Sequence, residues 1–313
     1  MGDSSAIEWT SATWNPLVGC TRVSEGCRHC YAERTAYRLE AMGQHAYQGI
    51  TKKVGGEIRW TGKVNLVPSS LTLPLTWKKP RRIFVNSMSD LFHEDVGDLW
   101  IDSIFRVMMS APQHTYQILT KRPERMLAYL KDQGLGWPWA HVWLGVSVED
   151  QATADARIPL LLQTPAAVRW VSYEPALGPV DFDGDPYSGP GWLRGWYTEP
   201  EHWRGCDGSC SAGRCPEPIQ VENEHRLDWL VIGGESGPGA RPFDLAWARQ
   251  TIAQGRKAGV PVFVKQMGAN PVSIHTITGS PRVVYHPLLK DRKGGTMAEW
   301  PDDLRVREYP EKG

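Results

Sequence analysis

The sequence alternates short apolar segments with amphipathic ones, and this alternation constrains the fold more than any other feature. The apolar segments are rich in β-branched and aromatic residues and end at polar residues or glycine, which is typical of strands. Such strands are predicted at residues 82–87, 116–120, 141–148, 168–173, 228–233 and 260–265, with an earlier one expected near residues 14–19. Their nearly continuous apolar character favours a parallel sheet that is covered on both faces.

Helical periodicity follows most of these strands. Helices are predicted at residues 31–39, 96–109, 123–131, 150–162 and 243–258, and Gly259 stands where a C-cap glycine is expected. Repeated strand–helix units imply an α/β fold with right-handed crossovers, either a partial or complete βα-barrel or an open doubly wound sheet. The barrel is favoured because polar residues recur at the strand ends, where barrel active sites form. These residues are Asn86 to Asp90, Lys121 and Arg122, Ser147 and Glu149, Glu174, Glu235, and Lys265 with Gln266.

Three regions are expected along the chain. The barrel core is predicted to comprise residues 1–182 and 228–270. After the fifth strand, residues 183–227 are rich in Gly and Pro and show no helical period, so we expect a cysteine-rich metal-binding insertion there. Residues 271–313 are rich in Pro and charge and are expected to form an irregular C-terminal extension.

Composition excludes several classes of protein. The 313 residues carry 35 Lys and Arg against 35 Asp and Glu, so any contact with nucleic acid must come from a local patch. No run of about 18 apolar residues and no signal peptide is evident, which predicts a cytoplasmic protein without membrane contact. The six cysteines then indicate metal binding, because the cytosol keeps thiols reduced.

The first three cysteines are Cys20, Cys27 and Cys30, separated by six and two residues. Thiolates at this spacing can converge on one metal centre from a loop and the start of a helix. A zinc site would need a fourth ligand, for which His29 is the neighbouring residue. An iron–sulfur cube held by three cysteines instead leaves one iron with an open position, which is a catalytic feature. Three buried cysteines without metal are the remaining interpretation.

A second group lies in the insertion and consists of His202, Cys206, Cys210 and Cys215. A structural Zn²⁺ bound by these four residues would fold a segment that has little apolar periodicity of its own. An auxiliary iron–sulfur cluster is the alternative, because Pro216 directly after Cys215 resembles the end of a ferredoxin loop. We expect this site to lie at the edge of the barrel mouth, since the insertion follows the end of a strand.

Several longer motifs carry a family resemblance. They are IEWTSATWNP at residues 7–16, CRHCYAER at 27–34, LGVSVEDQ at 144–151, VSYEPALGPV at 171–180, VIGGESGPGARP at 231–242 and VFVKQMG at 262–268. In this order they resemble the phage three-cysteine-motif family of uncharacterised proteins, which is itself similar to the radical S-adenosylmethionine (radical SAM) enzymes. The resemblance covers residues 7–268 and does not identify a substrate.

The resemblance implies a partial βα-barrel with a [4Fe-4S] cluster at its mouth, bound by Cys20, Cys27 and Cys30. It implies that the open iron chelates S-adenosylmethionine and that a 5′-deoxyadenosyl radical abstracts a substrate hydrogen. An electron donor such as flavodoxin or ferredoxin would be a partner, and a further partner protein could deliver substrate. The first cysteine gap departs from radical SAM enzymes, which commonly have three residues there, whereas this chain has six.

The resemblance also implies cofactor-binding roles by position. His29 occupies the place before the last cysteine that usually lies against the adenine, and Tyr31 follows that cysteine. The end of the second strand usually faces the cofactor's amino group, and here it offers Ser87, Ser89 and Asp90. After the sixth strand, paired glycines permit close backbone approach to the adenosyl group or to substrate in the sequence Gly233, Gly234 and Glu235.

Polar residues at other strand ends complete the predicted site. Lys121 is expected to pair with a carboxylate, and Ser147 or Glu149 to reach the ribose; a solvated charge on a loop is the alternative for each. Glu174 closes an apolar strand, and burial near the barrel axis would raise its pKa so that it donates a proton or holds a substrate group. Its alternative role is a salt bridge to Arg169 or Lys265.

Basic and aromatic residues favour a nucleic-acid substrate. Basic clusters occur at residues 78–82 and at Lys121, Arg122 and Arg125. Loop aromatics able to stack on bases are expected at Trp77, Trp137, Trp139, Trp192, Trp196 and Trp203. The leading prediction is a radical SAM enzyme that modifies or repairs a nucleic acid or nucleotide. The alternatives are a non-catalytic, zinc-stabilised nucleic-acid-binding protein and a radical SAM enzyme that acts on a peptide or small metabolite.

Overall fold

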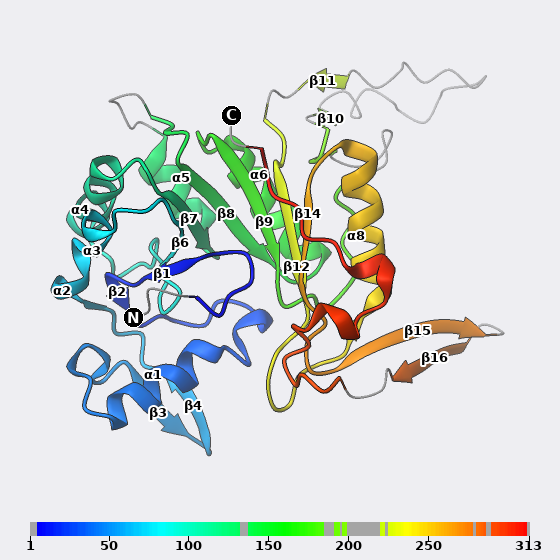
Figure 1. Cartoon of the computed structure of the whole chain (residues 1–313), viewed down its shortest axis with the longest axis horizontal. Helices are drawn as coiled ribbons and strands as arrows, with labels where there is room; N and C mark the ends of the chain where they lie inside the picture. The colour runs from blue at the N-terminus through cyan, green and yellow to red at the C-terminus, as the bar shows by residue number, and fades with distance from the viewer. Residues whose placement is uncertain are drawn as a thin grey trace, which may run out of the picture.

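A curled sheet of seven parallel strands forms the centre of the molecule (Figure 1). The computed structural model describes residues 5–131, 137–184, 191–194, 196–198, 220–222, 225–277, 280–285 and 289–311. The strands are β1 (Ala12–Trp14), β6 (Arg82–Val85), β7 (Thr115–Thr120), β8 (Val142–Val148), β9 (Val168–Tyr173), β12 (Trp229–Gly233) and β14 (Val262–Gln266). They lie side by side in chain order, whereas a doubly wound sheet reverses its order. The α/β fold with a partial barrel is therefore confirmed at the level of the sheet.

Helices connect consecutive strands over the outer face of the sheet (Figure 1). They are α4 (Asp98–Ser110), α5 (Pro123–Leu130), α6 (Gln151–Gln163) and α8 (Leu245–Ala258), each within two residues of its prediction. The carboxylate of Asp150 caps α6 by accepting a hydrogen bond from the backbone N–H of Thr153 at 2.9 Å. Gly259 ends α8 with a φ of 68°, which favours glycine at this C-cap.

Aromatic side chains fill the concave face of the sheet near the starts of its strands. Trp9, from the segment before β1, packs against Phe84 and Trp170 at ring-centroid distances of 4.8 and 5.1 Å. Trp143, Trp229 and Phe263 belong to the same buried cluster. This aromatic layer closes the bottom of the half-barrel, so the remaining space lies above it, at the carboxyl ends of the strands.

A small lobe carries the first cysteine triplet beside β1. It contains β2 (Leu17–Val18), α1 (Tyr31–Ala41), β3 (Thr51–Val54), β4 (Glu57–Trp60), β5 (Asn65–Leu66) and two short 3-10 helices, η1 (Glu25–Cys27) and η2 (His45–Tyr47). The short helices α2 (Pro68–Leu71) and α3 (Leu73–Thr76) follow β5 and pack against α4. The strand expected near residues 14–19 was misplaced, because the strand of the main sheet ends at Trp14 and residues 17–18 pair with β5 instead.

The C-terminal region is more regular than expected. Within residues 271–313, β15 (Pro271–Ile277) and β16 (Ser280–Tyr285) form an antiparallel hairpin, and β13 (Phe243–Asp244) pairs with β15. After η3 (Met297–Glu299) and η4 (Asp302–Leu304), the chain runs along β14, where the backbone N–H of Val264 donates to the carbonyl of Val306 at 2.8 Å. This last segment covers the free edge of the sheet.

Most of the insertion expected at residues 183–227 lies outside the described residues. Its described parts include β10 (Trp196–Thr198) and β11 (Gln220–Glu222), which pair antiparallel. His202, Cys206, Cys210 and Cys215 all fall outside, so the metal site expected there stays a prediction. None of the helices in the described ranges combines the length and the apolar character of a membrane-spanning segment.

Candidate functional site

One cavity of about 250 Å³ opens at the carboxyl ends of the sheet strands, above the aromatic layer. Its wall brings together most of the residues that the sequence predicted for the site. These are Cys20, Cys27, His29, Cys30, Tyr31, Ser87, Ser89, Asp90, Lys121, Ser147, Glu174, Gly234 and Glu235. Gly233 and Glu149 are not part of this wall, although a Cβ on Gly233 would lie only 2.6 Å from the Glu174 carboxylate.

The three cysteines lie on one segment, residues 19–30, here called the cysteine loop. Cys27 ends η1 and Cys30 directly precedes α1, and all three thiols are half-buried. The loop begins at Gly19, whose φ is 102° and where a Cβ would lie 2.2 Å from the carbonyl oxygen of Lys63. Only glycine fits this position without displacing backbone, so the turn that brings the loop over the cavity depends on it.

Arg122, which follows β7, holds the first part of the cysteine loop. Its Nη1 lies 3.8 Å from the Sγ of Cys20 and 3.1 Å from Asp90 Oδ2, and its Nη2 donates to the hydroxyl of Thr21. The pKa of the Cys20 thiol is raised to about 12, chiefly by burial, with Asp90 adding to the rise and Arg122 opposing it. A metal that binds Cys20 must therefore displace its proton.

The residues after β6 are engaged mainly by protein groups. Asp90 accepts hydrogen bonds from the backbone of Phe92 at 3.0 Å, the hydroxyl of Thr120 at 2.7 Å and the backbone of Lys121 at 3.0 Å, besides pairing with Arg122. The hydroxyl of Ser87 donates to Asn15 at 3.1 Å and that of Ser89 to the Leu17 carbonyl at 3.0 Å. Asp90 thus orients Arg122, while each serine hydroxyl, having donated its proton to the protein, can still accept a hydrogen bond.

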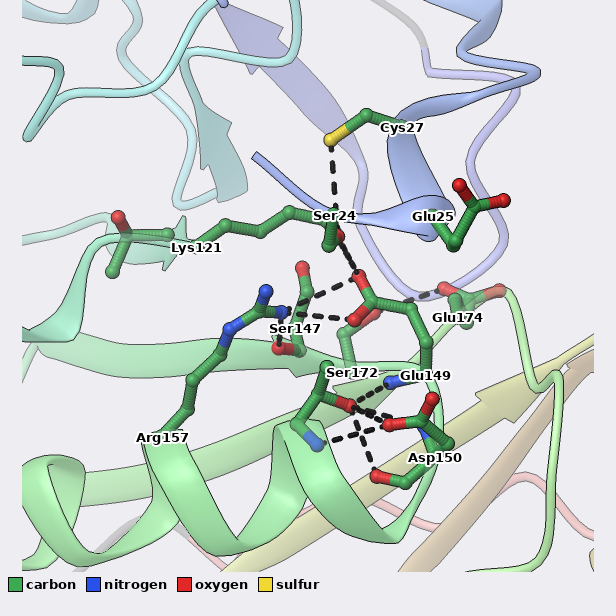
Figure 2. Close-up of polar contacts among 12 residues, drawn as sticks. Ser24, Glu25, Cys27, Lys121, Ser147, Glu149, Asp150, Arg157, Ser172 and Glu174 are labelled. Carbon is green, nitrogen blue, oxygen red and sulfur yellow. Dashed lines mark hydrogen bonds and ion pairs between the residues drawn. The ribbon is translucent and has the colours of Figure 1, made fainter. Parts of the chain in front are cut away.

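Glu149, at the end of β8, anchors the middle of the cysteine loop (Figure 2). Its Oε1 accepts a hydrogen bond from the Ser24 hydroxyl at 2.9 Å and lies 3.2 Å from Lys121 Nζ, and its Oε2 lies 3.0 Å from Arg157 Nη1. A Cβ on Gly26 would lie 2.3 Å from Oε1, so the loop backbone packs directly against the carboxylate. Lys121 thus pairs with a carboxylate of the protein itself, and its expected cofactor-binding role stays a prediction. Glu149 lies beneath the loop rather than on the cavity wall, where a ribose contact would require it.

Glu235, after β12, anchors the loop from the opposite side through Arg241. The Nε of Arg241 lies 3.2 Å from both Glu235 carboxylate oxygens, and its Nη2 donates to the carbonyl of Glu25 at 2.9 Å. Burial opposes the negative charge of Glu235, but the hydrogen bonds and charge of Arg241 outweigh it and lower the pKa of Glu235. The sequence reasoning missed Arg241, although the motif at residues 231–242 contains it.

Glu174, after β9, pairs with Lys265 of β14. Lys265 Nζ lies 3.1 Å from Oε1 and 3.2 Å from Oε2, and the Ser172 hydroxyl donates to Oε2 at 3.2 Å. The salt bridge to Lys265 that the sequence offered as an alternative role is therefore confirmed. Arg169 stands near the start of β9, at the other end of the sheet.

Three buried side chains of the cavity wall, those of Trp9, Asn86 and Gln266, carry polar atoms with no hydrogen-bond partner among the described residues. Asn86, which is 2% exposed and has a φ of 61°, leaves both its amide nitrogen and its amide oxygen unpaired. Gln266, which is 3% exposed, leaves Oε1 unpaired while its Nε2 donates to the Gly234 carbonyl at 2.9 Å. An unsatisfied buried group of this kind costs about 1–3 kcal/mol, so the Asn86 and Gln266 amides are available to a bound ligand or to water. Sequence analysis assigned no individual role to Asn86, although its place directly after a strand was an available signal.

The residues expected to contact nucleic acid are arranged differently from the prediction. Trp77 and Trp192 are 6% and 3% exposed and belong to the core, and Trp137 and Trp139 pack partly buried against it. The exposed stacking role was therefore wrong for Trp77 and Trp192, while Trp203 and the side chain of Trp196 lie outside the description. The basic cluster at residues 78–82 leads into the start of β6, so it lies at the end of the sheet opposite the cavity.

The side-chain geometry bears on metal binding by a single ion. Across the described ranges, no group of three or more His, Cys, Asp or Glu side chains is arranged to hold a single metal ion. This arrangement gives no support to a single zinc ion shared by the three cysteines and His29.

A family model described as "Protein of unknown function (DUF5131)" matches residues 4–295. The chain belongs to this family. No curated protein and no solved structure matches it.

Proposed function

We propose that this member of the DUF5131 family is a radical SAM-type enzyme. In this proposal Cys20, Cys27 and Cys30 bind a [4Fe-4S] cluster whose open iron takes S-adenosylmethionine. The observation that carries it is the meeting of all three thiols with the strand ends of a half-barrel at one cavity. Fold alone is weaker support, because one fold hosts many functions.

The donor set suits a cluster better than a single ion. In a cube-type cluster each cysteine thiolate binds a different iron, so the thiols surround a group larger than one ion. Such a set is compatible with a loop that lines a cavity without forming a single-ion site among the described residues. Arg122 lies next to the Sγ of Cys20, so it would place a positive charge beside a cluster-bound thiolate.

The cysteine loop is held in place before any ligand binds. Arg122 donates to Thr21 in the first part of the loop, and Glu149 accepts from Ser24 in its middle. Arg241, which pairs with Glu235, donates to the carbonyl of Glu25. Each anchor comes from a different strand end, so the rigid sheet determines where the thiols lie. Outer residues of this kind orient metal ligands in known metal sites, and they favour a functional loop over a passive connection.

The chain's own residues would position the reactants. When bound, the cluster and S-adenosylmethionine supply reductive cleavage of the cofactor and removal of a hydrogen atom from the substrate. Asn86 and Gln266 offer unpaired amide groups to a polar ligand, and the aromatic layer below them excludes water. Glu174, paired with Lys265 on the wall, is the candidate to hold or move a proton at its carboxylate.

For the substrate we propose a nucleic acid or nucleotide that is modified or repaired. Its support is a positively charged hollow beside the cavity mouth, lined by Arg34, Arg38, Arg292 and Lys293. An electron donor such as flavodoxin or ferredoxin completes the proposed system, and zinc or an auxiliary cluster at His202, Cys206, Cys210 and Cys215 remains part of the proposal.

Cofactor cleavage tests the proposal. Anaerobically purified protein is reconstituted with iron and sulfide, reduced with dithionite and given S-adenosylmethionine, and 5′-deoxyadenosine is quantified by mass spectrometry. We expect product from wild type and from Met109→Ala, whose sulfur-bearing side chain is exposed on α4, and none from Cys30→Ala. Absence of product from wild-type protein that has bound iron would overturn the proposal. Zinc without iron after anaerobic purification would favour a zinc-stabilised binding protein.

A further inference from the structure

A second hollow, here called the basic groove, adjoins the cavity mouth. Its lining residues are Tyr31, Arg34, Thr35, Arg38, Ser236, Gly237, Arg292 and Lys293. Tyr31 and Ser236 also line the cavity, so the two hollows share a border. A ligand that lies in the groove therefore reaches the space beside the cysteine loop.

The groove concentrates positive charge in a chain whose formal net charge is zero. No acidic side chain is among its lining residues. Arg34, Arg38 and Arg292 are exposed and form no ion pair within the described part of the chain, whereas Lys293 pairs with Glu8 at 2.7 Å. Exposed arginines elsewhere do find partners, as Arg249 does with Asp303 at 2.6 Å. Unpaired cations gathered in a hollow create a local positive potential that attracts anions.

One face of α1 supplies half of the groove. Tyr31, Arg34, Thr35 and Arg38 follow the three- and four-residue spacing that places side chains on the same side of a helix, while Ala32, Glu33 and Ala36 are buried on the other side. Like charges four residues apart, as in Arg34 and Arg38, repel each other and destabilise a helix. An anion bound between them removes this repulsion.

Tyr31 presents an aromatic surface where the groove meets the cavity. Its side chain is 47% exposed, yet its hydroxyl donates a hydrogen bond to the Ser87 carbonyl at 2.8 Å. The ring is thus oriented while it remains accessible. An oriented, exposed ring beside a row of cations is the combination that single-stranded nucleic acid uses, with bases stacked on aromatics and phosphates on basic groups.

We propose that the basic groove binds the phosphate backbone of a single-stranded nucleic acid and that Tyr31 stacks on the base at the cavity mouth. The inference rests on the proposed function, an enzyme acting on a nucleic acid or nucleotide, and specifies a single-stranded polymer whose base or sugar enters the cavity. A single strand is favoured because a paired base is not accessible to chemistry inside a duplex. Free nucleotides and acidic polypeptides are the ligands that the experiment must separate from it.

Fluorescence polarisation of a labelled 20-nucleotide mixed-sequence strand, as DNA and as RNA, measures binding by the cluster-containing protein without reductant or S-adenosylmethionine. The test variant is Arg34→Ala/Arg38→Ala. The matched control, Lys78→Ala/Lys79→Ala, removes the same charge from exposed positions at the opposite end of the sheet. Thermal melting verifies that each variant is folded, and Tyr31→Leu tests the stacking contact separately. ATP and polyglutamate serve as competitors.

Each phosphate contact with a single strand contributes about 0.7 to the salt slope of log K, which is about fivefold in affinity at 0.1 M salt. We therefore expect Arg34→Ala/Arg38→Ala to bind about 25-fold more weakly and to lower the slope by about 1.4, while the control retains both values. No strand binding by wild type at low salt, equal losses in both double variants, or equal competition by ATP or polyglutamate would overturn the inference. This assay needs no cofactor chemistry, so its result is independent of cofactor cleavage. Strand binding without 5′-deoxyadenosine formation would support the groove as a nucleic-acid site and reject the enzyme class. Formation of 5′-deoxyadenosine without strand binding would support the enzyme class and reject the groove.

Discussion

Replacing Glu149 by Gln tests how the cysteine loop is held. Glu149 is 1% exposed and lies between Lys121 and Arg157, whose side chains are 18% and 9% exposed. The substitution keeps the shape of the side chain and removes its negative charge. Lys121 and Arg157 therefore lose their counter-charge while they remain largely buried. Figure 2 shows that the same carboxylate receives the hydroxyl of Ser24 from the loop above it.

The expected loss of stability follows from these contacts. Breaking a buried ion pair by removing one partner costs about 3–5 kcal/mol. The lower end, about 3 kcal/mol, applies here because Arg157 keeps a hydrogen bond to the Ser147 carbonyl at 2.7 Å and a glutamine oxygen still accepts from Ser24. With a urea m value of about 3 kcal/mol/M for a chain of this size, the unfolding midpoint falls by about 1 M.

Urea unfolding followed by tryptophan fluorescence measures this shift, and iron analysis after reconstitution measures whether the loosened loop still binds a cluster. The control is Asp303→Asn, which breaks an exposed pair with Arg249 whose side chains are 44% and 55% exposed, and which we expect to cost less than about 1 kcal/mol. A Glu149→Gln midpoint that matches the control, together with full iron content, would refute the reasoning.

Three further changes probe the same site. Gly26→Ala places a Cβ 2.3 Å from the Glu149 carboxylate, so we expect reduced iron content in a colorimetric assay. The control Gly97→Ala adds its Cβ in open space and should retain full iron content. Equal iron contents in the two variants would contradict the close packing at Gly26. Asn86→Gly removes a side-chain amide that makes no hydrogen bond among the described residues, so the free energy of unfolding should fall by no more than about 1 kcal/mol. Calorimetry should show at least about tenfold weaker binding of S-adenosylmethionine, and unchanged affinity would exclude the ligand contact. The lowered pKa of Glu235 means that its pairing stabilises the fold above its unfolded pKa of about 4.3 and that this contribution is lost as pH falls through the lower folded pKa. Wild type and Glu235→Gln should therefore differ in urea midpoint at pH 7 and converge at acid pH, and a gap independent of pH would contradict this sign.

The sheet could be predicted because its strands are buried on both faces and therefore appear as continuous apolar runs. The strand near the N-terminus was harder to place, since β1 has only three residues and Pro16, which lacks a backbone N–H, separates it from β2. Grouping polar strand ends at one cavity needed only the rule that parallel strands end on the same side.

The roles of those strand ends could not be predicted, because their partners are distant in the chain. Glu149 meets Ser24 across 125 residues, and Arg241 meets Glu25 across 216. No local periodicity encodes such pairs. In the sequence, a carboxylate that anchors a loop therefore cannot be distinguished from one that binds a ligand. The same limit explains Trp77 and Trp192, which follow no strand or helix pattern yet pack into the core.

The central claim is that the cysteine loop binds a [4Fe-4S] cluster with one iron open to S-adenosylmethionine. Electron paramagnetic resonance of the reduced, reconstituted protein with and without the cofactor tests it most directly. The account predicts a reduced-cluster signal that shifts when S-adenosylmethionine is added and that disappears in Cys30→Ala. A protein that binds no iron at Cys20, Cys27 and Cys30, or a signal that is identical with and without the cofactor, would contradict it.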